Sequence, residues 1–582
     1  MKDSFFVLTP LFIAFCFANR YVSRNSCCVI EGETSPNIYS PTTMATSSVS
    51  RRRFIRDMSL GAASLALLPP FTLNKTRAPR PNILYIMSDD HAYQAISCYG
   101  TGLNKTPNID RLAQEGVRFS RSFCTNSVCA PCRAVLLTGK YSHLNGVLDN
   151  VLAFDGAQET FPKLLQRSGY FTALFGKWHL KSDPTGFDYW NILPGQGVYY
   201  NPDFIDMGKR IRRPGYVTDL ITDDCINWIR QQKSGKPFCA LLHHKAPHRN
   251  WMPDLKHLSM FEGEDLPVPG TFDDDYATRS DAARRQEMRI ADHLTLSTDL
   301  KFEPDTTSGM VSPADRANLR DWGMMFRRLD EDQKKAWQAA YGPRNEEFKK
   351  AGLKGEALAR WKYERYIKDY LRCIASIDEN VGRVLDYLDQ SGLAENTIVV
   401  YTSDQGFYLG EHGWFDKRFM YEESLRMPLL IRYPAEVRPR VSNDMVLNLD
   451  FAPTFLDYAG ASIPEEMQGD SMRGVLGGKT PENWRKSIYY HYYEYPGWHM
   501  VKRHYGVRTD RFKLMHFYYD IDAWEMYDLQ NDPHELNNIY ADPRYAGTVA
   551  ELKTELERLR RKYKDTDEKK FLPKEGEVRD RD

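Results

Sequence analysis

Four short apolar runs occur along the chain, and each is followed at once by polar residues. The runs cover 83–87, 170–175, 238–242 and 397–402. None of them alternates between apolar and polar positions, which is typical of strands buried on both faces of a parallel sheet. The pattern therefore predicts four strands of one parallel sheet, each ending in a polar cluster.

Amphipathic helices are predicted between these strands. The clearest covers about 361–390 and ends before Gly392, which terminates it. Its apolar face comprises Ile367, Leu371, Ile374, Ile377, Val381, Val384, Leu385 and Leu388. Alternating strands and helices predict an α/β fold with helices on both sides of a sheet. Ligands of such sheets bind beyond the carboxyl ends of the strands, so the four polar clusters should converge there.

The pattern changes after Trp484. Short aromatic-rich strands are predicted at 487–493, 505–508, 511–518 and 525–529, and a helix follows at about 548–563. These elements predict a smaller C-terminal subdomain, in which one helix packs on a four-stranded antiparallel sheet.

Composition excludes some classes of partner. The chain has 582 residues, of which 42% are apolar, and its formal net charge is zero. Such a chain builds a large core. Its charge gives no support for binding nucleic acid or a membrane surface, so an anionic ligand must be bound by a local cluster of cations.

The N-terminal region resembles an export signal. Residues 50–56 read Ser-Arg-Arg-Arg-Phe-Ile-Arg, and a weakly apolar run follows at 58–70. This resembles a twin-arginine signal, whose apolar segment is too short to span a membrane. We therefore expect export to the periplasm or the medium, no transmembrane segment in the mature chain, and translation from Met44. A basic loop beside a core helix is the alternative, and the run at 5–18 could itself be a signal peptide.

The stretch 129–139 presents a cysteine at a helix start. Pro131 fixes φ near −65° and suits the first turn of a helix, where unpaired N–H groups favour negative charge. Arg133 adds a permanent cation. The alternative is a buried free cysteine before a core helix. Seven cysteines lie outside the N-terminal segment, an odd number without the spacing of a disulfide framework.

Two polar clusters offer oxygen ligands for a metal. Asp89 and Asp90 follow the first apolar run, and Asp404 and Gln405 follow the fourth. Oxygen donors suit Ca²⁺ or Mg²⁺ better than zinc. An Asp-Asp pair alone is more often a turn or a helix cap, but a second pair at another strand end favours the metal.

The cationic candidates are Lys177, His179, His248 and Lys417. Lys177 and His179 lie two residues apart, so an extended segment directs both side chains the same way. Individually, each lysine is more often a surface group and each histidine a structural one. Together with a metal, such cations would stabilise an anionic transferring group.

The motif C-x-P-x-R followed by Thr-Gly, at Cys129 to Gly139, resembles the signature of the sulfatase family. The resemblance covers about 81–538 and includes five separated motifs. It implies an alkaline-phosphatase-like fold and oxidation of Cys129 to Cα-formylglycine by a formylglycine-generating enzyme. Cys132 stands where the family usually has serine, and a Cys129–Cys132 disulfide is the alternative to modification.

The resemblance also implies the roles of the other residues. One calcium would be bound by Asp89, Asp90, Asp404, Gln405 and the formylglycine oxygen at position 129, with Gln405 replacing the commoner asparagine. Arg133 would hold the attacking hydroxyl, while Lys177 would bind sulfate. His248 or Lys417 would assist departure of the sugar oxygen, and His179 would take the proton of the second hydroxyl. His412 would contact substrate or order the loop of Lys417.

The resemblance suggests three regions. We expect an export segment and linker at 1–80, a catalytic domain at 81–483 and the C-terminal subdomain at 484–582. A charged stretch at 252–360 is interpreted as a helical insertion that shapes the rim of the pocket.

Two stretches, 243–253 and 491–508, resemble the bacterial branch of N-acetylglucosamine-6-sulfatases. The expected substrate is therefore a 6-O-sulfated N-acetylglucosamine of a mucin or heparan-type glycan, with His499, Arg503 and His504 as candidate sugar contacts. The alternatives are a sulfatase acting on a galactan or galactosamine sulfate, a phosphatase or phosphodiesterase with a serine or threonine nucleophile, and an inactive carbohydrate-binding relative.

Overall fold

The computed structural model describes residues 80–232, 235–302 and 322–574. The export signal expected at 50–70 lies outside these residues. Within the described ranges, ten strands form one mixed sheet in the order β13-β2-β12-β9-β1-β8-β4-β5-β6-β7. Their bounds are β1 Asn82–Ser88, β2 Val117–Phe119, β4 Phe171–Lys177, β5 Tyr189–Leu193, β6 Asp203–Asp206, β7 Lys209–Arg212, β8 Phe238–His243, β9 Thr397–Ser403, β12 Leu429–Arg432 and β13 Arg440–Ser442.

The centre of this sheet is parallel and contains the four predicted strands. β1 pairs with β8 on one side and β9 on the other, and β8 pairs with β4. The register places Met87 beside His243, Ser88 beside Ser403, and Gly176 beside His243. The strands therefore end at one edge of the sheet, and the polar residues after them are brought together, as predicted.

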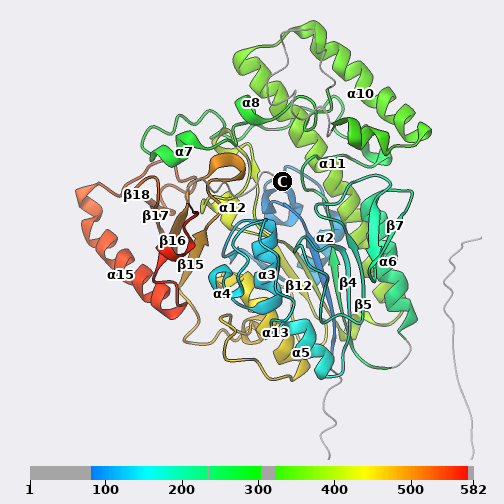
Figure 1. The fold of residues 1–582 in the computed structure, drawn as a ribbon, viewed down its shortest axis with the longest axis horizontal. Coiled ribbons are helices and arrows are strands. Elements are labelled where there is room, and N and C mark those ends of the chain that lie inside the picture. Colours follow the sequence, from blue (N-terminus) through cyan, green and yellow to red (C-terminus); the bar gives the residue numbers. More distant parts are fainter. Residues whose placement is uncertain (1–79, 233–234, 303–321, 575–582) are drawn as a thin grey trace, which may run out of the picture. The chain divides into compact units, whose positions relative to one another are not determined.

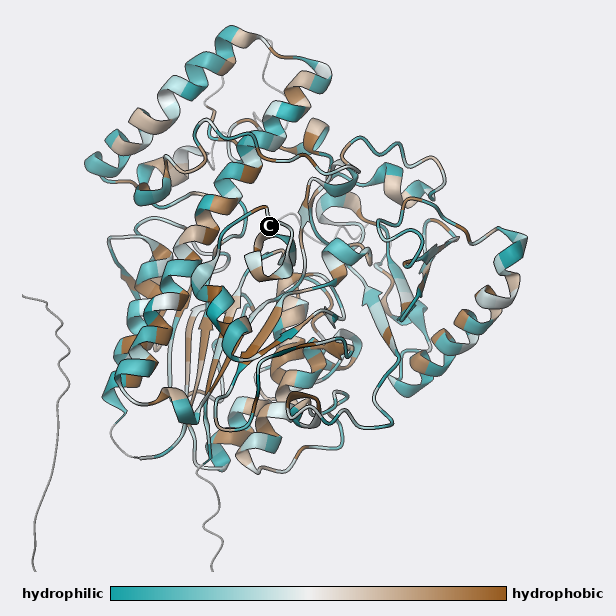
Figure 2. Cartoon of the chain, turned by 180° about the vertical axis from the view of Figure 1, so that it is seen from behind, coloured by the Kyte–Doolittle hydropathy of each residue, from teal (hydrophilic) through white to brown (hydrophobic). Residues whose placement is uncertain are grey.

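Side chains of β1 alternate between two buried cores. Ile83, Tyr85 and Met87 belong to the core that contains helices α3 (Cys129–Thr138), α5 (Phe161–Arg167) and α13 (Phe451–Ala459). Leu84 and Ile86 belong to the core under helices α2 (Pro107–Glu115), α6 (Val217–Gln231) and α11 (Gly355–Gln390). Figures 1 and 2 show the two helical layers from opposite sides, with the hydrophobic strands between them. The predicted α/β class is confirmed.

The long helix α11 begins at Gly355, a few residues before the predicted start. Each residue of the predicted apolar face is fully buried, because it packs in the core that this helix shares with α2, α6 and one face of the sheet. The helix α10 (Glu331–Ala351) precedes it and begins with a capping box formed by Asp330 and Gln333.

A separate four-stranded antiparallel sheet, in the order β15-β16-β17-β18, lies in the C-terminal part of the chain, where the sequence predicted one. Its strands are Ser487–Tyr492, His504–Thr509, Phe512–Phe517 and Ala523–Asp528, and helix α15 covers Ala546–Lys562. Leu552, Leu556 and Leu559 of α15 are buried in the same core as the sheet. The predicted sheet-and-helix arrangement is confirmed (Figure 1).

The remaining strands and helices are short. The strands are β3 Ser122–Phe123, β10 Tyr408–Leu409, β11 Phe415–Asp416 and β14 Val446–Leu447, and the helices are α4 Ser142–Asn145, α7 Asp281–Arg285, α8 Ile290–His293, α12 Glu422–Leu425 and α14 Arg473–Leu476. No helix in the described ranges has the length and apolar character needed to cross a membrane.

Candidate active site

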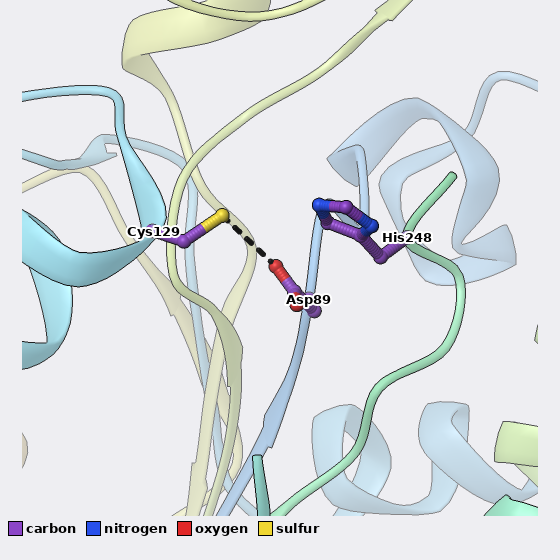
Figure 3. A group of neighbouring side chains, drawn as sticks. All are labelled: Asp89, Cys129 and His248. Atoms are coloured by element: carbon purple, nitrogen blue, oxygen red, sulfur yellow. Dashed lines mark hydrogen bonds between the residues drawn. The ribbon is translucent and has the colours of Figure 1, made fainter. Parts of the chain in front are cut away.

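Cys129 is the first residue of helix α3 and is fully buried at the carboxyl edge of the sheet. Its sulfur lies 3.4 Å from Asp89 Oδ1, which follows β1, and the His248 side chain approaches the same carboxylate (Figure 3). Cys129 and Cys132 are both free thiols, and Cys132 Sγ instead donates to the carbonyl oxygen of Asn126. The alternative Cys129–Cys132 disulfide is therefore not formed.

The Cys129 thiol is poorly suited to act as a nucleophile itself. Burial raises the pKa of this thiol above its ordinary value, and the negative charge of Asp89 raises it further. The thiolate is the reactive form of cysteine, so the unmodified side chain would be almost entirely unreactive at neutral pH. Cys129 thus lies where a nucleophile would be expected, but its unmodified thiol is not a suitable nucleophile.

Three buried carboxylates converge beside Cys129. Oxygen atoms of Asp89, Asp90 and Asp404 lie within 4.8 Å of one another. Burial and the neighbouring carboxylate of Asp89 raise the pKa of Asp404 to about 8. Burial also raises the pKa of Asp90 to about 6, although Lys417 opposes the shift. A bound cation would relieve this repulsion.

Gln405 completes an oxygen set that fits a hard divalent cation. Its Oε1 is buried and has no hydrogen-bond partner among the described residues, while its Nε2 donates to Asp90 Oδ1. The donor set is oxygen from three carboxylates and one amide, which suits Ca²⁺ or Mg²⁺. The residues present therefore fit the metal expected from the sequence.

Arg133 and Lys177 connect the carboxylates to neighbouring elements. Arg133 donates to Asp404 Oδ2 at 3.1 Å and to the Lys177 carbonyl oxygen at 2.7 Å. Lys177, at the end of β4, donates to Asp89 Oδ2 and, at 2.5 Å, to Gln196 Oε1. Burial would raise the pKa of Asp89, but the positive charge of Lys177 and other neighbours holds it well below the usual range.

The other predicted cationic residues lie around the same cluster. Lys417 Nζ donates to both oxygens of Asp90 at 2.7 Å, and His248 Nε2 lies 3.7 Å from Asp90 Oδ2. Burial and the charge of Lys177 hold the pKa of both His248 and His179 well below the ordinary value. Both imidazoles are thus neutral, and the Nδ1 atom of His179 has no partner in the described part of the chain.

His244, directly after β8, makes the stability of this region sensitive to acid. Both of its ring nitrogens lack partners among the described residues, and burial lowers its pKa to about 4. Because the folded pKa lies below the unfolded value of about 6.5, stability is fully present above pH 6.5 and is lost as the pH falls towards 4. The loss reaches about 2 kcal/mol at pH 5.

We expect His244→Phe to reduce the fall in the free energy of unfolding between pH 7 and pH 5 by about 2 kcal/mol. Denaturant titration at both pH values measures the effect. The exposed His534→Asn variant is the control and should keep the wild-type slope. Equal slopes for His244→Phe and wild type would contradict the prediction.

A cavity of about 670 Å³ opens beside this cluster. His248 and Lys417 line it, together with residues that the sequence analysis missed: Asn150, Gln196, Tyr199, Lys245, Asp416, Arg418 and Trp498. Asp416 and Arg418 flank the predicted site residue Lys417, so their place in the sequence could have identified them as cavity residues. Asn150 and Gln196 lie in loops without a motif. Met252, Thr298 and Met325, from the stretch interpreted as an insertion, also line the cavity.

The four candidate substrate contacts have different environments. His499 lines the cavity, with Nε2 3.3 Å from Asp416 Oδ2. His412 is buried against Asp274 at 2.8 Å, which fits the loop-ordering alternative. Arg503 donates to the carbonyl oxygens of Tyr495 and Phe571.

His504 accepts from the Met420 N–H and is fully buried. The structure thus does not bring His412, Arg503 or His504 to the cavity wall.

Fold and site together define an α/β protein with a nucleophile position and an oxygen-rich candidate metal site at the carboxyl edge of its sheet. The family model described as "Sulfatase" matches residues 81–461, and that described as "N-sulphoglucosamine sulphohydrolase, C-terminal" matches 410–562. The chain belongs to the sulfatase family and is a sulfuric ester hydrolase.

Individual relatives agree with this assignment. The chain is 51% identical over 520 residues to an N-acetylglucosamine-6-O-sulfatase of Bacteroides thetaiotaomicron, covering 87% of this chain and 91% of the relative. A solved structure of BT4656 in complex with its substrate D-glucosamine-2-N,6-O-disulfate matches with a TM-score of 0.80 and 51% identity, covering 84% of this chain and 99% of that one. A phosphonate monoester hydrolase of Agrobacterium radiobacter, 22% identical with a TM-score of 0.61 and coverage of 83% and 96%, shares the fold.

Proposed function

We propose that this sulfatase hydrolyses 6-O-sulfate esters of N-acetylglucosamine in glycans. The observation that carries the proposal is the 51% identity to an N-acetylglucosamine-6-O-sulfatase over nearly the whole of both chains. The similar solved structure contains a glucosamine that carries a 6-O-sulfate, which supports the same position of the ester.

The cavity beside the carboxylate cluster has the composition expected of a sugar site. Trp498 supplies an aromatic surface, while Asp416, Arg418 and His499 supply hydrogen-bonding groups. A primary 6-O-sulfate projects away from the sugar ring. It would reach Lys177 and Lys417 while the ring remains in the cavity.

We further propose Cα-formylglycine at position 129 and one calcium ion held by Asp89, Asp90, Asp404 and Gln405. The hydrated aldehyde would supply a hydroxyl nucleophile, and the cation would stabilise negative charge during attack. The raised pKa of the Cys129 thiol supports modification, because the unmodified side chain is a poor nucleophile. The unpartnered oxygen of Gln405 supports the cation.

The neighbouring residues would perform electrostatic and proton-transfer roles. Arg133 would hold the attacking hydroxyl, while Lys177 and Lys417 would bind the sulfate oxygens. Lys417 or His248 would assist departure of the sugar oxygen: Lys417 would donate a proton as the S–O bond breaks, whereas the neutral His248 would donate a hydrogen bond. His179 is neutral because its pKa is lowered, so it would accept the proton that must leave the second hydroxyl.

We expect the enzyme to desulfate N-acetylglucosamine 6-sulfate at least about tenfold faster, as kcat/KM, than N-acetylgalactosamine 6-sulfate or galactose sulfates, which corresponds to about 1.4 kcal/mol of transition-state discrimination. Sulfate release from this panel measures the preference, with the corresponding phosphate ester as a control. A tenfold preference for a galacto-configured sugar would contradict the substrate assignment but not the family.

Maturation and export complete the proposal. A formylglycine-generating enzyme would modify Cys129, and the twin-arginine machinery would export the chain to the periplasm or the medium. The division into 81–483, with an insertion at 252–360, and 484–582 is likewise a proposal. Deleting the arginines at 51–53 should retain the enzyme in the cytoplasm, which fractionation would test.

A further inference from the structure

Glu494 is a buried carboxylate that follows strand β15 and joins two walls of the cavity. One of its oxygens accepts a hydrogen bond from Arg418 Nη1, and the other accepts from the backbone N–H of Asn150 at 3.3 Å. The Tyr492 hydroxyl donates to the Glu494 carbonyl oxygen at 2.8 Å. Only 1% of Glu494 is exposed, so its charge depends on these partners for stabilisation.

The first partner belongs to the loop of Lys417. Arg418 lines the cavity, and its Nε also donates to Asp416 Oδ1 at 3.1 Å. Asp416 and Arg418 have φ values of 76° and 96°, a region that is strained for residues with a side chain. Such a conformation persists where neighbouring groups hold it, and Glu494 is one of the groups that hold Arg418.

The second partner belongs to the helix of the nucleophile. Asn150 Oδ1 accepts from the Ala130 N–H at 3.1 Å, in the first turn of α3. Val128, the N-cap residue of that helix, provides no side-chain cap, so Asn150 satisfies an N–H group that the helix leaves unpaired. Asn150 lines the same cavity as Arg418. A single carboxylate from the C-terminal part of the chain thus contacts both sides of the site.

We infer that Glu494 is a positioning residue for sugar recognition, which acts by holding the Arg418 guanidinium against the cavity. The guanidinium would then donate hydrogen bonds to the hydroxyl groups of the sugar rather than to its sulfate. The inference rests on the proposed function, since it requires that the cavity binds the sugar.

The test is a double-mutant cycle of Glu494→Gln and Arg418→Ala. Glutamine keeps the size of the side chain but removes the charge that pairs with Arg418. We expect Glu494→Gln to raise KM for the preferred sugar sulfate about tenfold or more, and to change kcat by less than about threefold. Turnover of a small aryl sulfate should also change by less than about threefold. In the Arg418→Ala background, Glu494→Gln should have no further effect.

Glu525→Gln is the matched control. Glu525 is fully buried in β18 and accepts from the Tyr421 hydroxyl and the Ser280 N–H, at 2.8 and 2.7 Å, but does not line the cavity. It should keep the wild-type KM, and thermal denaturation compares the stability of the two variants.

Three results would overturn the inference. Glu494→Gln could lose as much activity on the aryl sulfate as on the sugar sulfate, or it could leave KM for the sugar sulfate unchanged. The effects of Glu494→Gln and Arg418→Ala could also be fully additive. A wild type that cleaves the aryl sulfate but no sugar sulfate would overturn the proposed function as well, so the two failures are distinguishable.

Discussion

Replacing Cys129 with alanine is expected to lower sulfate release by more than about 10⁴-fold, because the variant lacks the side chain from which the proposed nucleophile is made. Cys129→Ser should be similarly inactive when it is expressed with a cysteine-specific modifying enzyme alone. Alanine is smaller than cysteine and serine is similar to it in size. Neither crowds this fully buried position, so the fold should be retained. Steady-state assays with the preferred sugar sulfate measure the loss.

The chemical state of position 129 provides an independent measurement. Mass spectrometry of the tryptic peptide from Ser122 to Arg133 should show an aldehyde at position 129 and a thiol at Cys132. Cys132→Ser restores the residue usual in the family at that position and should still be modified, which makes it the matched control. A fully active preparation that contains only the Cys129 thiol, or a disulfide, would contradict the proposal.

Asp404→Ala is expected to lose both the metal and turnover, whereas Lys417→Ala should keep the metal and lose turnover. Asp404 is one of the three converging carboxylates, while Lys417 contacts them from the cavity side. Removing a carboxylate ligand weakens the binding of a hard cation directly. We expect a loss of activity of at least about 10³-fold for each variant. Elemental analysis and sulfate release measure the two effects separately.

Asp378→Asn is the control for the loss of a buried aspartate. Asp378 is buried and accepts from the N–H groups of Asn108 and Ile109 at the start of α2, and it is not one of the three converging carboxylates. This variant should keep its calcium and its activity. Chelation of the wild type should abolish activity, and calcium should restore it. Restoration by zinc alone, with zinc found in the protein, would contradict the oxygen-ligand site.

The fold and the polar cluster were predictable because both depend on local patterns. An uninterrupted apolar strand followed by a polar pair identifies a strand end, and parallel neighbours bring such ends together. Asp89, Asp404, Lys177 and Lys417 accordingly meet within hydrogen-bonding or ion-pair distance of a common cluster.

The cavity wall was less predictable because its residues come from loops whose positions depend on the whole fold. Asn150 and Gln196 carry no motif, and their roles depend on contacts with Ala130 and Lys177.

The error for Arg503 has the opposite origin. A charged side chain in an aromatic-rich segment is usually exposed, so the sequence predicted that Arg503 would be free to contact the sugar. Arg503 is nevertheless fully buried, and its Nε and Nη1 atoms donate to the backbone carbonyl oxygens of Tyr495 and Phe571. The local sequence does not reveal such partners.

The strand order limits when Cys129 is accessible during synthesis. β1 lies between β8 and β9, so the centre of the sheet cannot be completed until Ser403 has been made, about 270 residues after Cys129. At roughly 5–20 residues per second, this interval lasts roughly 14–55 s. Since Cys129 is fully buried in the folded chain, the proposed modification must occur before folding is complete. Slower translation of the segment between Cys129 and Ser403 should therefore increase the fraction of chains that are modified.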